Sequence, residues 1–204
     1  MLAILPATVA DRLMAQPGMI ADRHDGCTIV FADLVGFTAH SKGKDAEQIV
    51  GELNTVFTRF DTLTAQHGAE KIKTIGDGYM AATGVPDPDT DHVAHACDLA
   101  LAMLEAMPGL NAHMGTDFAL RVGVHTGPAV AGVVGTSKFG YDVWGDTVNL
   151  ASRLESTRTP GLVVTSAAVA AALNTQHHVE PVGVKDLKGQ GPTKVYRLTR
   201  SAAV

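Results

Sequence analysis

The sequence predicts an α+β fold with a ferredoxin-like core, in which the elements follow the order β-α-β-β-α-β. An apolar, β-branched run at residues 27–33 is typical of a buried strand. Two segments with apolar residues at helical spacing, 45–68 and 90–107, flank a hairpin with Gly76-Asp77-Gly78 at its tip. We expect an extra helix and extra strands to extend this core on its C-terminal side.

The sequence predicts one boundary, after residue 24. Residues 1–24 are predicted to form a helical lead-in, broken by Gln16-Pro17-Gly18, and residues 25–204 to form the main domain. Residues 34–44 read as a loop, Asp45 as the N-cap of the first long helix, and Gly68 as its end. The hairpin's second strand is expected at about 79–84.

The second half contains shorter elements. We expect strands at "LRVGVHTG" and "AVAGVVG", with a turn between them at His125–Pro128. A helix at 146–157, capped by Asp146, follows a loop. A strand at 161–166, a short helix at 167–174 and a closing strand at 194–199 complete the prediction, while His177 and His178 read as loop residues.

The composition limits the classes of function. The 204 residues suffice for one domain with a full core, and a net charge of −5 gives no general reason to expect nucleic-acid binding. No apolar run approaches the length of a membrane span, so no membrane contact is expected from this chain itself. Cys27 and Cys97 read as reduced core residues. We therefore expect a cytoplasmic protein, or the cytoplasmic portion of a larger or membrane-tethered one.

Two carboxylates fall where they can meet. Asp33 ends the first strand, and Asp77 lies at the hairpin tip, where by itself it is most simply a turn residue. In a ferredoxin-like sheet the first strand lies between other core strands, so it can neighbour the first strand of the hairpin. Two adjacent carboxylates repel unless a cation lies between them, and Mg²⁺ prefers carboxylates, water and phosphates.

The stretch "LVGFTAHS" strengthens this interpretation. It runs from a strand end toward a helix start, and Gly36 permits close approach of the backbone to a ligand. Backbone N–H groups in such a turn can hold phosphate oxygens, although many such junctions are only structural. Beside two carboxylates, the stretch predicts a site for phosphate and metal.

Four stretches resemble the class III nucleotidyl cyclases, the adenylyl and guanylyl cyclases: "FADLVGFT", "KTIGDGYMA", "RVGVHTGPAVAGVVG" and "YDVWGDTVNLASRLES". They occur in the order typical of that family, and the resemblance covers residues from about 27 to 198. It implies an adenylyl cyclase that converts ATP to 3′,5′-cyclic AMP and pyrophosphate with two Mg²⁺ or Mn²⁺ ions per active site.

The resemblance also implies a role for each site residue. Asp33, Asp77 and the Leu34 carbonyl would be the metal ligands. The triphosphate would bind the backbone amides of Val35, Gly36, Phe37 and Thr38, and Lys188 would contact its terminal phosphates. Lys73 and Asp142 would read the base, Asn149 would orient the ribose, and Arg153 would stabilise charge on the α-phosphate. Pro128 stands where some family members have an arginine that contacts phosphate, and the chain departs from them there.

The base-reading pair can be tested from chemistry alone. Adenine offers an acceptor at N1 and a donor at its 6-amino group, whereas lysine only donates and ionised aspartate only accepts. Lys73 with Asp142 therefore complements adenine, and guanine presents the reverse pattern. Guanylyl cyclases typically have Glu and Cys at these positions, so the sequence favours ATP over GTP.

The same family shares each active site between two protomers. Metal carboxylates come from one protomer and base-reading residues from the other, and this chain carries both sets. The resemblance therefore implies a homodimer with two equivalent, shared sites.

Other interpretations predict different residues. A non-catalytic nucleotide-binding module would lack a metal Asp, the Asn or the Arg, and none is missing here. A phosphodiesterase would need a denser His/Asp cluster. His92 and His95 lie three residues apart on a helix, but no third metal ligand is apparent, so an exposed helix face explains them more simply. Taken singly, Lys73, Asn149 and Arg153 suit any exposed surface.

Overall fold

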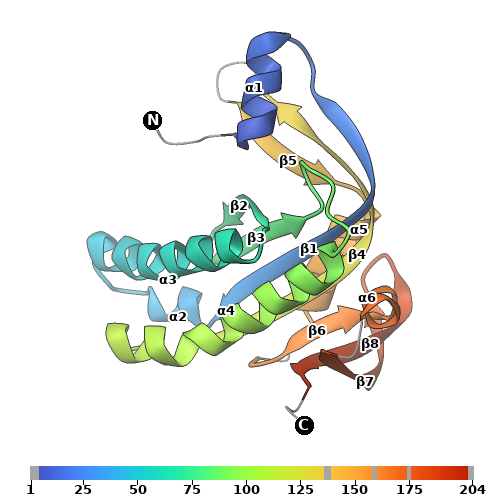
Figure 1. Cartoon of the computed structure of the whole chain (residues 1–204). Helices are drawn as coiled ribbons and strands as arrows, with labels where there is room; N and C mark the ends of the chain where they lie inside the picture. The colour runs from blue at the N-terminus through green and yellow to red at the C-terminus, as the bar shows by residue number, and fades with distance from the viewer. Residues whose placement is uncertain (1–4, 136–138, 158–159, 174–175, 202–204) are drawn as a thin grey trace.

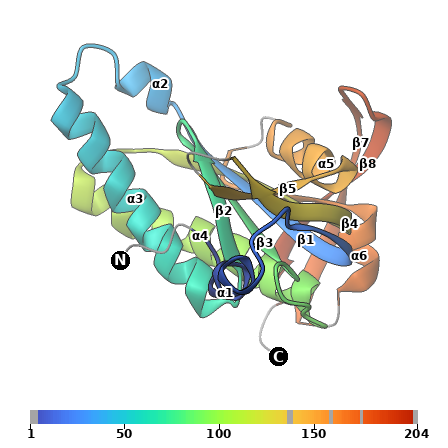
Figure 2. The same cartoon turned by 90° about the horizontal axis from the view of Figure 1, so that it is seen from above.

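The computed structural model describes residues 5–135, 139–157, 160–173 and 176–201. Within them, one eight-stranded sheet carries helices on both faces (Figures 1 and 2). The helices are α1 (Ala7–Ala15), α2 (Phe37–His40), α3 (Ala46–Gln66), α4 (His92–Met114), α5 (Asp146–Glu155) and α6 (Ala167–Ala172). The strands are β1 (Ala21–Val35), β2 (Glu70–Ile75), β3 (Gly78–Thr83), β4 (Ala119–Val134), β5 (Gly140–Trp144), β6 (Val163–Ser166), β7 (His177–Leu187) and β8 (Gly191–Arg200).

The predicted ferredoxin-like core is confirmed. Its four strands lie in the order β2-β3-β1-β4 and pair antiparallel, and β6, β8 and β7 extend the sheet beyond β4. The expected pairing of β1 with the hairpin's first strand is wrong, because β2 lies at the sheet edge and β3 pairs with β1. The turn between β2 and β3 nevertheless lies beside the end of β1, since Gly78 is the register partner of Asp33.

Alternate residues of β1 enter two separate apolar clusters. Val30 and Ala32 face α3 and α4, where the core includes Phe60 and Leu99. Ile29 faces the other way, into a cluster that also contains residues of α1, β5 and α5. The near-continuous apolar run therefore reflects a central strand buried on both faces. Figures 1 and 2 show α3 and α4 side by side over their face of the sheet.

The structure corrects one prediction in strand β4. The expected turn at His125–Pro128 is wrong, because β4 continues through it for 16 residues. The register of β1 against β4 shifts between His24 and Cys27, which pair with Ala129 and Gly127. This irregularity lies opposite Pro128, a residue with no N–H to give to a sheet, so the mismatch is taken up by the partner strand.

Several other elements differ from expectation. β5 and β7 were predicted as loops; most of β7 is exposed, so its sequence carries no apolar alternation, and His177 and His178 lie within it. Asp146 is the first residue of α5, after an N-cap at Gly145, rather than the cap itself. β1 begins six residues earlier than predicted, and the predicted boundary between residues 24 and 25 lies within this strand. The boundary itself stays a prediction.

Among the described residues, α4 is one helix with the length and apolar composition to cross a membrane. This differs from the expectation that no run would qualify. Its buried residues, which include Cys97, Leu99 and Met103, belong to the core that α3 and α4 form with the sheet. A core helix of a globular domain meets the same criteria of length and composition.

Helix α5 lies directly on β4 at Gly123. A Cβ atom at this position would stand 2.2 Å from the Glu155 nitrogen and 2.5 Å from the Ala151 oxygen, both backbone atoms that cannot move separately from the helix. We expect Gly123→Ala to lower the free energy of unfolding by about 1–3 kcal/mol through overpacking. Urea unfolding measures this effect.

Gly51 in α3 is the matched control, since a Cβ there meets nothing within 4 Å. Gly51→Ala is expected to raise stability by up to about 1 kcal/mol through helix propensity. If Gly123→Ala is as stable as wild type, α5 does not pack on β4 as closely as the structure shows.

Candidate active site

The ends of β1 and of the β2–β3 hairpin bring Asp33 and Asp77 to one place. The Leu34 N–H donates to the Asp77 carbonyl oxygen at 3.4 Å. A Cβ at Gly78 would lie 3.6 Å from the Asp33 carboxylate, an ordinary contact distance, so the Asp33 side chain lies directly beside the turn. Gly76 adopts φ 62°, which a turn of this kind requires. The two carboxylates predicted as a pair therefore lie on adjacent segments.

The electrostatics of this pair suit a cation. Burial raises the pKa of the Asp77 carboxyl, and the negative charge of Asp33 raises it further. Hard carboxylate oxygens are ligands that Mg²⁺ and Mn²⁺ prefer. Across the described ranges, no cluster of three or more His, Cys, Asp and Glu side chains is placed to hold a metal. Backbone carbonyl, water or phosphate oxygens would have to complete the coordination of any ion here.

Arg121 is a residue of this region that the sequence interpretation missed. It lies on β4 as the register partner of Asp33 on β1, and its guanidinium donates to the Asp33 carboxylate. Its Nε also lies 2.9 Å from the Oε1 of Glu155, in a charge contact at the end of α5. An arginine within a strand carries no signal in the sequence until pairing places it beside a carboxylate.

The turn after β1 is firmly braced. Gly36 adopts φ 88°, and its carbonyl accepts from the N–H groups of Ala39 and His40 in α2. The side chain of Glu52, only 8% exposed, lies 2.8 Å from His40 Nε2 and 2.9 Å from Lys44 Nζ. Burial opposes its ionisation, yet these bonds hold the pKa of Glu52 below its usual value. The network fixes α2, and with it the backbone of residues 35–38.

Lys73 and Asp142 form an ion pair across the outer strands. Lys73 Nζ of β2 lies 2.5 Å from Asp142 Oδ2 of β5, and both side chains remain partly exposed. Only the resemblance suggested that residues 69 positions apart act together; β5 was not predicted. Among the described residues, no hydrogen bond or ion pair joins them to Asp33 or Asp77.

Helix α5 and the turn between β7 and β8 present the remaining predicted residues. Arg153 and Lys188 line one cavity of about 320 Å³, which lies between the end of α5 and the β7–β8 hairpin. Lys185 also lines it, and the sequence interpretation missed this lysine because β7 was not predicted. In the described part of the chain, neither Asn149 nor Arg153 has a side-chain hydrogen bond or ion pair, so both are available to a ligand.

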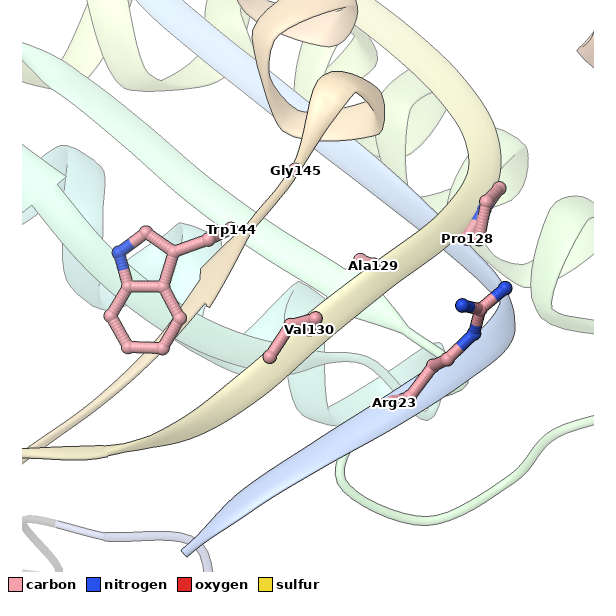
Figure 3. A pocket seen from close by; sticks show the side chains of 6 residues that line it. All are labelled: Arg23, Pro128, Ala129, Val130, Trp144 and Gly145. Carbon is pink, nitrogen blue, oxygen red and sulfur yellow. The ribbon is translucent and has the colours of Figure 1, made fainter.

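An apolar surface lies on the outer side of β1, β4 and β5. A pocket of about 170 Å³ is lined by Arg23, Pro128, Ala129, Val130, Trp144 and Gly145. Figure 3 shows Trp144 on one side of β4 and Arg23 on the other, with Val130 between them. Trp144 and Val130 are 40% and 45% exposed. This pocket thus brings two exposed apolar side chains close to Arg23.

His92 and His95 do not form a metal site in the described residues. His92 Nδ1 lies 2.8 Å from the Thr28 hydroxyl, and His95 Nδ1 lies 2.7 Å from an Asp89 carboxylate oxygen. Both rings therefore have partners within the protein. His92 is half-buried against Thr28, so the expected exposed helix face is wrong for this residue.

Comparison with known proteins decides the family. The profile of the adenylate and guanylate cyclase catalytic domain matches residues 19–200. The chain belongs to this family. An adenylate cyclase of Mycobacterium tuberculosis is 41% identical over 196 residues, which are 96% of this chain and 44% of that protein. The human guanylate cyclase soluble subunit beta-2 is 39% identical over 98% of this chain and 33% of its own length.

The solved structures of cyclase domains share the fold. The guanylate cyclase domain of RhGC from Catenaria anguillulae, in complex with GTP, superposes with a TM-score of 0.85 at 29% identity, over 89% of this chain and all of that one. This chain spans less than half the length of the mycobacterial and human relatives named above. Cyclase domains of this class generally use divalent metal ions, which the pair Asp33 and Asp77 suits.

Proposed function

We propose that this cyclase domain converts ATP to 3′,5′-cyclic AMP and pyrophosphate. The ion pair between Lys73 and Asp142 carries the proposal, since it offers a donor on β2 and an acceptor on β5, 2.5 Å apart. Adenine presents the complementary acceptor and donor. Because relatives of both specificities are similar to this chain, the choice of nucleotide rests on this pair.

Guanine fits the pair poorly. Its N1–H would face the ammonium of Lys73, and its 6-oxo group would face the carboxylate of Asp142. Each contact would leave a polar group unpaired, which is the strong form of discrimination between substrates.

The rest of the site would handle the triphosphate and ribose. Asp33, Asp77 and the Leu34 carbonyl would hold two divalent ions, Mg²⁺ or Mn²⁺, which when bound polarise phosphate oxygens and activate the ribose 3′-hydroxyl. The amides of residues 35–38, fixed by the Glu52 network, would hold the phosphates together with Lys188. Arg153 would stabilise charge developing on the α-phosphate, and Asn149, one turn earlier on α5, would orient the ribose.

We infer a homodimer with two shared active sites. Lys73 and Asp142 form one group and Asp33 and Asp77 another, with no bonds joining the two groups within the described residues. The exposed surface around Trp144 supports association with a second copy. Twofold symmetry would then complete both sites. We propose a cytoplasmic location, which the free thiols of Cys27 and Cys97 support.

The direct test incubates the purified chain with ATP or GTP and Mg²⁺ or Mn²⁺, followed by chromatography. We expect cyclic AMP from ATP, with a specific activity that falls on dilution because each site needs two chains. A preference for GTP, or no cyclic product from a folded dimer, would overturn the proposal.

The base-reading pair has its own test. Lys73→Glu with Asp142→Cys removes two contacts to adenine, each worth about 1–3 kcal/mol, so the efficiency with ATP should fall by roughly thirtyfold or more. The ratio of kcat/KM for ATP to that for GTP is expected to move toward GTP. Lys71→Glu changes a lysine of the same strand that pairs with Asp61, and it should leave the ratio unchanged. An unchanged ratio in the folded, dimeric double variant would show that the pair does not read the base.

A further inference from the structure

Arg121 lies between two carboxylates that come from different parts of the fold. Its Nη2 donates to Asp33 Oδ2 on β1, and its Nε lies 2.9 Å from Glu155 Oε1 at the end of α5. The three side chains are 25%, 22% and 11% exposed, respectively. Water therefore screens these charges only in part.

Asp33 and Glu155 share this one guanidinium, and Asp77 lies on the turn beside Asp33. In the described residues, no second basic side chain forms an ion pair with Asp33, Asp77 or Glu155. The cluster is short of positive charge.

We propose that Arg121 is a positioning residue that occupies the Asp33 carboxylate in the metal-free chain and is displaced onto Glu155 when a divalent ion binds. This inference rests on the proposed function, which makes Asp33 a metal ligand. A guanidinium and a metal ion at one carboxylate repel each other, so the ion must compete with Arg121. Glu155 keeps the displaced arginine paired, which avoids a partly buried cation without a partner.

Competition of this kind sets the affinity for metal before nucleotide arrives. A charge-assisted hydrogen bond at Asp33 must be given up, so the nucleotide-free chain should bind metal weakly. Substrate phosphates then supply the further ligands that the protein lacks. Arg121 would thus favour loading of the metal together with the nucleotide.

The experiment measures Mn²⁺ binding to the nucleotide-free protein by electron paramagnetic resonance of free Mn²⁺. Arg121→Gln with Glu155→Gln removes one positive and one negative charge and so keeps the net charge. We expect Mn²⁺ to bind this double variant about tenfold or more tightly than wild type, because the competing hydrogen bond is gone. Unchanged or weaker binding would overturn the proposal.

Arg200→Gln with Glu105→Gln is the matched control. Arg200, on β8, also lies between two carboxylates, both of α4: 2.7 Å from Glu105 and 3.0 Å from Asp98. The same exchange of charges there should leave Mn²⁺ binding unchanged. A similar gain in Mn²⁺ affinity in this control would show that the effect comes from a general change in stability, and it would also overturn the proposal.

Two single variants complete the design. Arg121→Lys keeps the charge that the fold needs, but a single ammonium cannot contact both carboxylates as the guanidinium does, so its affinity for Mn²⁺ should lie between those of wild type and the double variant. An affinity no higher than that of wild type contradicts the proposal. Asp33→Ala should lose the site. If Asp33→Ala binds Mn²⁺ like wild type, the metal assignment fails; if it loses binding while the Arg121 variants are unchanged, only the role of Arg121 fails.

Discussion

Replacement of Asp77 by alanine is expected to abolish cyclic AMP formation while the fold stays intact. The substitution removes a proposed metal ligand, and loss of such electrostatic stabilisation lowers kcat by about 100-fold or more. The turn itself depends on Gly76 and should persist. Product formation is measured by chromatography at saturating ATP and Mn²⁺.

The stability of the Asp77→Ala variant shows whether activity is lost because a metal ligand is missing or because the protein is unfolded. The pKa of Asp77 is raised in the folded chain, so its ionised form disfavours folding above its unfolded pKa. At neutral pH the metal-free variant should unfold at the same or a higher temperature than wild type, and this difference should vanish as pH falls below that pKa. Asp117→Ala, at an exposed loop position before β4, is the matched control and should keep full activity. Near-normal activity of folded Asp77→Ala would refute the metal assignment.

Two inactive variants are expected to restore activity when mixed. Asp33→Ala damages the proposed metal half of a site, and Arg153→Ala damages the other half. A heterodimer of the two has one intact site, so equal amounts with random exchange should give about one quarter of wild-type activity. The measurement is the rate of cyclic AMP formation after mixing.

The control for mixing uses two lesions in the same half. In a heterodimer of Asp33→Ala and Asp77→Ala, each site has a damaged metal half, so no activity should return. Exchange of subunits is followed by energy transfer between labelled chains. A mixture of Asp33→Ala and Arg153→Ala that exchanges subunits yet stays inactive would show that the sites are not shared between chains.

The parts of the fold that the sequence predicted well have strong local signals. β1, α3 and the β2–β3 hairpin combine apolar periodicity with turn residues, and the core topology then places Asp77 beside Asp33. β5 has only five residues and pairs with β4 alone, so no local pattern marks it. The proximity of Asp142 to Lys73 was therefore beyond reasoning from periodicity.

Other features depend on register rather than on local sequence. Gly127-Pro128 resembles a turn in the sequence, but β4 continues through it, and the register shift lies opposite it in β1. Arg121 likewise has no distinguishing neighbours along the chain, and its partners Asp33 and Glu155 are 88 and 34 positions away. Such residues become visible only when pairing of strands and packing of α5 are known.

The length of β4 bears on how this domain tolerates insertions and deletions. Arg121 is the register partner of Asp33 toward one end of the strand, and Gly132 is the register partner of Asp142 toward the other. The eleven steps between them correspond to about 36 Å along the strand. Gain or loss of a single residue would turn every following side chain to the opposite face. In a symmetric pair of chains that error occurs twice, so β4 should keep its length while exposed turns vary.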